Sequence, residues 1–129
     1  MNKVYRGVII EESLGDKKIL DSLKILSTRV SEVTAKHQTP DLKRWTLHTV
    51  EIEQGRADEV ARQIARSIGP NRWYADFNNG TDHYIVYKDK IFHCDMNSEA
   101  DYAAAKQYGI SLGIPPYQVD FHPKDSKSI

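Results

Sequence analysis

Residues 46–80 read TLHTVEIEQGRADEVARQIARSIGPNRWYADFNNG, and this stretch decides the fold. Polar and apolar residues alternate over residues 46–53, which is the period of a half-buried strand. Residues 56–68 change to the helical period, and their apolar residues form one stripe: Ala57, Val60, Ala61, Ile64, Ala65 and Ile68. Residues 73–78 indicate a second strand, and Asn79-Gly80 is a strong hairpin turn. The stretch predicts a layered domain that contains both helix and sheet.

The residues after this turn predict further strands and a second helix. Residues 83–88 and 91–95 flank Asp89-Lys90, so they fit either two strands of a meander or one long strand with a bulge. Ser98 is typical of a helix N-cap, and acidic residues follow it where the helix dipole favours them. Small residues of that helix predict the face toward the sheet, among them Ala100, Ala103 and Ala104. Residues 117–121 alternate and predict a short last strand.

The order of these elements is typical of a ferredoxin-like βαββαβ sheet with two helices on one face. Residues 4–12 are apolar on both faces, so they predict an interior strand that extends this sheet. Residues 16–33 fit either one helix or a short helix and then a strand from about residue 24; the β-branched residues favour the strand. We expect one α+β domain over residues 1–121 and a polar tail at 122–129.

Composition narrows the classes of function. The chain has 129 residues, enough for one domain, and its 18 basic and 18 acidic residues cancel. A nucleic-acid binder usually carries a basic excess, so we expect no nucleic-acid partner. No apolar run approaches the roughly 20 residues of a membrane helix, and the first residues lack a signal core. A single cysteine, Cys94, permits no internal disulfide. We therefore expect a cytoplasmic protein with no membrane partner.

Asp76 is the polar residue that the strand pattern explains least. It lies in the middle of a predicted strand, where aspartate is disfavoured. If Trp73 faces the helices, then Tyr74 and Asp76 face the opposite side of the sheet. Should the N-terminal segment or a partner subunit cover that side, Asp76 would lose water and need a partner. The alternative interpretation is a solvated carboxylate on an open face.

Five residues form the predicted ligand-binding set: Asp76, His48, Trp73, Tyr74 and Tyr84. Tyrosine and tryptophan suit pockets because each joins apolar area to a polar tip. His93, Cys94 and Asp95 are of metal-ligand type, but neighbours in a strand point to opposite faces and no ligand spacing such as Cys-x-x-Cys supports a site. We expect no metal and no cofactor.

Three phrases of the chain carry a resemblance to a known family: WTLHTVEI at 45–52, WYADF at 73–77 and GIP at 113–115. In these phrases the chain resembles a family of small bacterial and archaeal proteins whose function is uncharacterised. The resemblance covers most of the chain. It implies no activity, so it supplies no site residue.

Two functional hypotheses follow from the residues themselves. The first is a small binding or regulatory domain that takes a small-molecule ligand and self-associates, because strands that are apolar on both faces leave more sheet surface than two helices can cover. The second is a small enzyme in which Asp76 or His48 acts as general base in a pocket lined by Trp73, Tyr74 and Tyr84. A pocket in which Asp76 and a histidine converge would favour the enzyme.

Overall fold

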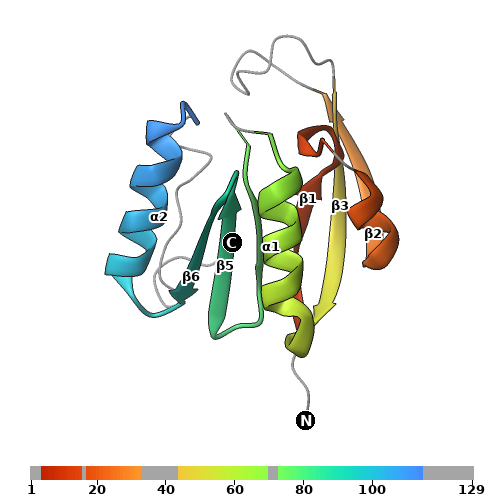
Figure 1. The fold of residues 1–129 in the computed structure, drawn as a ribbon. Coiled ribbons are helices and arrows are strands. Elements are labelled where there is room, and N and C mark those ends of the chain that lie inside the picture. The colour runs from red at the N-terminus through yellow and green to blue at the C-terminus, as the bar shows by residue number, and fades with distance from the viewer. Residues whose placement is uncertain (1–3, 16, 33–43, 70–72, 115–129) are drawn as a thin grey trace.

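A computed structural model describes residues 4–15, 17–32, 44–69 and 73–114. Its centre is a six-stranded antiparallel sheet with the order β2-β3-β1-β4-β5-β6 (Figure 1). The strands are β1 (Val4–Ile10), β2 (Lys24–Glu32), β3 (Arg44–Glu53), β4 (Ala75–Asn78), β5 (Asp82–Tyr87) and β6 (Lys90–Asp95). The helices are α1 (Ala57–Ser67) and α2 (Glu99–Ser111), with the short 3-10 turns η1 (Glu11–Ser13), η2 (Lys17–Ser22) and η4 (Gln54–Arg56). The predicted α+β class is confirmed.

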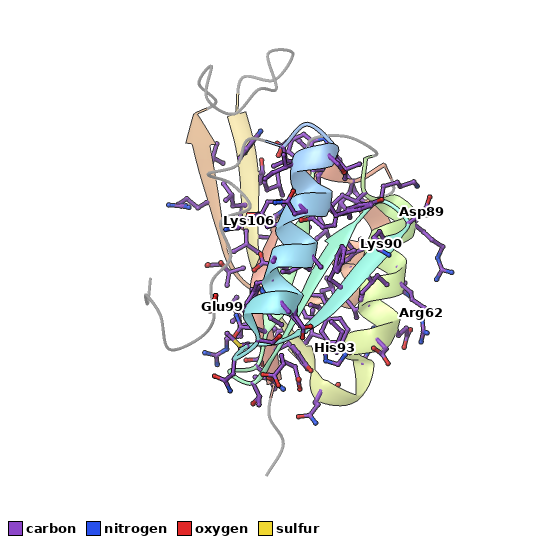
Figure 2. All side chains as sticks on the ribbon, turned by 90° about the vertical axis from the view of Figure 1, so that its left-hand side faces the viewer. Arg62, Asp89, Lys90, His93, Glu99 and Lys106 are labelled. Atoms are coloured by element: carbon purple, nitrogen blue, oxygen red, sulfur yellow. The ribbon has the colours of Figure 1, made fainter. Side chains whose placement is uncertain are left out.

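Helix α1 packs on the sheet through the predicted apolar stripe. Val60, Ala61 and Ile64 are fully buried, and they share one hydrophobic cluster with Phe77, Tyr84 and Val86 of the sheet. Arg62 lies on the outer surface of the helix, away from the sheet (Figure 2). The spacing of the apolar residues therefore predicted the buried face of this helix correctly.

Helix α2 packs on the opposite face of the sheet. Its Tyr102 and Ala105 share a second cluster with Ile85 and Tyr87, which alternate along β5 with the residues that face α1. The prediction of two helices on one face is therefore wrong. The physical reason lies in β5, which is buried on both faces and so needs a cover on each side.

The N-terminal third completes the middle and one edge of the sheet. β1 pairs with β3 on one side and with β4 on the other, so β3 and β4 are parallel to each other and are joined through α1. The short η2 followed by β2 confirms the helix-then-strand interpretation of residues 16–33. The paired β5 and β6 confirm the meander. The strand expected at 117–121 and the tail at 122–129 lie outside the described residues.

Candidate functional site

The five sequence-predicted residues do not share one pocket, although Tyr74 lies near Asp76: burial, and then the charge of Asp76, raises the pKa of Tyr74. Trp73 packs against Trp45, with ring centroids 5.5 Å apart. Tyr84 belongs to the cluster under α1, whereas Tyr74 packs against the cluster under α2. His48 lies on β3, on the side where β2 and η1 meet that strand. The tertiary structure thus separates the aromatic residues that the enzyme hypothesis placed around one general base.

Asp76 binds a histidine from the neighbouring strand. Nε2 of His83 lies 2.8 Å from Oδ2 of Asp76, and Nδ1 of His83 lies 3.0 Å from the hydroxyl group of Tyr102 on α2. Burial, followed by the charges of Cys94 and Asp76, raises the pKa of Tyr102 to about 12. The protonated phenol can therefore donate to Nδ1 while Nε2–H donates to the carboxylate. This network ties α2 to β4 and β5.

His48 has the same kind of partners. Its Nε2 lies 2.8 Å from Oε1 of Glu11, and its Nδ1 lies 2.9 Å from the hydroxyl oxygen of Thr28. The hydrogen bond from His48, together with Lys17 at 3.6 Å, lowers the pKa of the Glu11 carboxyl group. In both networks a histidine joins a carboxylate to a hydroxyl group, and both ring nitrogens are engaged within the protein. Such an arrangement fixes the imidazole in place instead of presenting it to a substrate.

A groove lies between η2 and α1, on the face of the sheet that α1 covers. Its volume is about 520 Å³. We call it the η2–α1 groove, and six residues line it: Lys18, Ile19, Ser22, Gln63, Arg66 and Ser67. The volume falls in the range of roughly 300–1,000 Å³ that is usual for small-molecule sites.

Hydrogen bonds join the two walls of the groove near both ends of η2. On one side the backbone N–H of Gly15 donates to the carbonyl of Ser67 at 2.6 Å, and that of Gly69 donates to Ser13 at 2.7 Å. On the other side the guanidinium group of Arg56 donates to the carbonyl of Ser22 at 3.2 Å. A site with fixed walls loses little conformational entropy when a ligand binds.

One residue that lines the groove has a buried polar atom with no partner among the described residues. The side-chain oxygen of Gln63 is buried and, among the described residues, accepts no hydrogen bond. A buried acceptor that is left unsatisfied costs about 1–3 kcal/mol, so native proteins rarely retain one without a water molecule or a ligand to supply the donor. Because this oxygen is buried, it lies within the packed wall of the groove and not on its open surface.

Sequence reasoning missed the groove. Its lysine, arginine, serine and glutamine residues are ordinary surface types, and nothing in their spacing shows that η2 and α1 lie side by side. The available signal was weak: Gln63 sits one position before Ile64, next to the apolar stripe of α1. A polar residue at the margin of a buried stripe is common, because that margin is half-exposed.

The described residues hold neither a cluster of metal ligands nor a membrane-spanning helix. Within the described ranges, no three His, Cys, Asp or Glu side chains gather closely enough to hold a metal ion. No helix in that same part of the chain is long and apolar enough to cross a membrane. Comparison with protein-family models, with curated proteins and with solved structures found no match. The geometry of the groove and of the two histidine networks is therefore the basis for a function.

Proposed function

We propose that the protein is a small binding domain and that the η2–α1 groove is its ligand site. The observation that carries the proposal is the groove itself, whose volume of about 520 Å³ is of ligand size and whose walls are joined by hydrogen bonds. We further propose a cytoplasmic setting, which the lone, buried thiol of Cys94 supports.

The enzyme hypothesis has less support. Its two candidate bases, Asp76 and His48, belong to different networks, and each is hydrogen-bonded to a neighbouring side chain. A general base needs an atom within reach of a substrate proton, and geometry decides this before pKa does. The groove does not include either residue.

The binding proposal can be tested with a panel of small polar molecules, both neutral and charged, added to the full chain. NMR signals of the Ile19 methyl groups and the Gln63 side-chain amide should shift and saturate with at least one member of the panel. Ile85 packs on the opposite face of the sheet and serves as the internal control, so its methyl signals should stay in place. If no molecule of the panel moves the Gln63 amide, the proposal is wrong.

Self-association through β2 is a second candidate, and the exposure of that strand favours it. β2 is at one edge of the described sheet, and it exposes Ile25, Leu26 and Val30 by 39%, 42% and 56%. An edge strand offers unpaired backbone groups to another chain. Antiparallel pairing of two copies would bring the apolar residues at opposite ends of β2 together and bury both sets.

Sedimentation at high micromolar concentration tests the dimer. The wild type should sediment as a dimer, and Leu26→Lys should be a monomer because the charge would be buried at the pairing edge. Ile110→Lys is the matched control: Ile110 is an exposed apolar residue on α2, far along the chain from β2. A wild type that is monomeric under these conditions would exclude the dimer and leave the groove proposal untouched.

A further inference from the structure

Aromatic and acidic side chains gather around Tyr84, next to the first turn of α1. The ring of Tyr84 stacks on that of His93 with centroids 4.3 Å apart, and it lies across the ring of Tyr5 at 5.4 Å. The hydroxyl group of Tyr84 donates to Oδ1 of Asp58, in the first turn of α1, at 2.5 Å. Asp82 lies two positions before Tyr84 on β5, and its Oδ1 is 3.6 Å from Nε2 of His93. We call these five residues the Tyr84 cluster, and none of them lines the η2–α1 groove.

Tyr5 brings a hydroxyl group without a partner to this cluster. The residue is 4% exposed, and among the described residues its hydroxyl group makes no hydrogen bond. The fully enclosed side-chain atom without a partner in those residues is the oxygen of Gln63, so the Tyr5 oxygen keeps contact with solvent. Burial, and then the charges of Asp82 and Asp58, raise the pKa of Tyr5, because both carboxylates lie near its hydroxyl group. Native proteins rarely leave such a group unpaired, so this hydroxyl group is suited to a ligand.

Three oxygen atoms of the Tyr84 cluster can each accept a hydrogen bond. They are Oδ2 of Asp58, Oδ2 of Asp82 and the hydroxyl oxygen of Tyr5, and they come from three different elements, α1, β5 and β1. A primary ammonium group has three N–H donors that point in different directions, and it has no acceptor. A guanidinium group is flat and fits the two oxygens of one carboxylate better. Since the described residues gather no set of metal ligands, an organic cation is the better complement.

We infer that the Tyr84 cluster binds the primary ammonium group of a small molecule. The ammonium group donates to Asp58, Asp82 and Tyr5, and the apolar part of the ligand lies against the ring of His93, whose side chain is 49% exposed. This second site does not depend on the η2–α1 groove, so either proposal can fail alone.

Four probes separate charge from hydrogen bonding in NMR titrations of the full chain. Propylammonium carries the charge and three donors, tetramethylammonium carries the charge without a donor, methylguanidinium carries flat donors, and propanol carries no charge. Propylammonium should shift the ring signals of Tyr5 and Tyr84 with saturation. It should bind about tenfold more tightly than tetramethylammonium or propanol, since hydrogen bonds between charged groups are the stronger ones. The ring signals of Tyr102, on the opposite face of the sheet, should stay in place.

Three variants locate the effect. Tyr5→Phe removes an oxygen that has no partner in the described structure, so it should stay folded and weaken propylammonium by about three- to tenfold. Asp82→Asn should weaken it by about tenfold. Glu59→Gln is the matched control, because it removes a carboxylate from the exposed position next to Asp58 in the first turn of α1. It should change the affinity by less than about twofold. Thermal unfolding of each variant shows that it is folded.

Several results would overturn this inference. Tetramethylammonium or methylguanidinium could bind as tightly as propylammonium, Tyr5→Phe could keep the affinity of the wild type, or Glu59→Gln could weaken binding as much as Asp82→Asn. Each would show a general attraction of cations to surface carboxylates, or a different class of cation. The absence of any saturable shift would exclude the site. The signals of Ile19 and Gln63 report on the η2–α1 groove separately, so these failures leave the proposed function untouched.

Discussion

Nε2 of His83 lies 2.8 Å from Oδ2 of Asp76, across the pairing of β4 with β5. In the register of these strands Asp76 stands opposite Ile85, so His83 reaches the carboxylate diagonally along the same face. The His83 side chain is 9% exposed and that of Asp76 is 29% exposed. Helix α2 covers the imidazole of His83 and shields it from water. The ring therefore needs hydrogen-bond partners within the protein, and Asp76 is the partner that β4 supplies.

Asp76→Ala should lower the free energy of unfolding by about 1–3 kcal/mol, because it removes the carboxylate that accepts from Nε2–H of the buried His83. Asp76→Asn should cost less, since an amide oxygen can still accept. Asp82→Ala is the matched control: its carboxylate lies 3.6 Å from His93, and both side chains are more than two-fifths exposed. That change should stay within about 0.5 kcal/mol. Chemical denaturation measures all three, and a neutral Asp76→Ala would mean that the diagonal pair is not formed in solution.

Ile64→Asp should unfold the domain. Ile64 is 0% exposed in the centre of the α1 stripe, and an unpaired carboxylate buried there costs several kcal/mol, a large share of the stability of a small domain. Arg62→Ala, two positions away on the exposed side, should change the melting temperature little (Figure 2). Circular dichroism during heating compares the two. Similar melting temperatures would show that the buried face of α1 is assigned wrongly.

Gly7→Ala should destabilise the middle of the sheet. A Cβ atom at Gly7 would lie 1.9 Å from the carbonyl oxygen of Asp76 and 2.5 Å from Cα of Phe77, so β1 and β4 would have to separate. Such overpacking costs at least about 1–3 kcal/mol. Gly55→Ala has open space around it and should be neutral or slightly stabilising. The difference between their denaturation midpoints is the measurement, and equal midpoints would contradict the close approach of β1 to β4.

The pair between Glu11 and His48 predicts a dependence of stability on pH. The hydrogen bond from His48 lowers the folded-state pKa of Glu11 below its ordinary value of 4.5, so the contact stabilises the fold above that pH. The stabilisation is lost as the pH falls through the lowered folded-state pKa. Glu11→Gln should therefore be less stable than the wild type at pH 7, and the difference should shrink in acid. Glu53→Gln, at an exposed position, is the control; a difference for Glu11→Gln that is constant from pH 7 to pH 3 would refute the linkage.

Local periodicity determined much of this fold. The helix at α1 and its buried stripe, the strand at β3 and the hairpin after Asn79 could be predicted, because each depends on residues within a few positions of one another. Gly80 adopts a φ of 92°, and the side chain of Asn79 accepts from the backbone N–H groups of Thr81 and Asp82. A turn of this kind depends only on adjacent residues, so the sequence predicts it.

The tertiary structure alone decided the side of the sheet on which α2 packs and the face that α2 buries. Tyr102, Ala105 and Gly109 are buried, whereas the expected Ala103 and Ala104 are exposed. Alanine occurs on several sides of this helix, so apolar residues do not mark one face. The position of α2 depends on β5, because the second apolar face of that strand must be covered. The partner of Asp76 and the nearness of Lys18 to Arg66 were also fixed by contacts between residues distant in sequence, which depend on strand register and packing and leave no periodic trace in the chain.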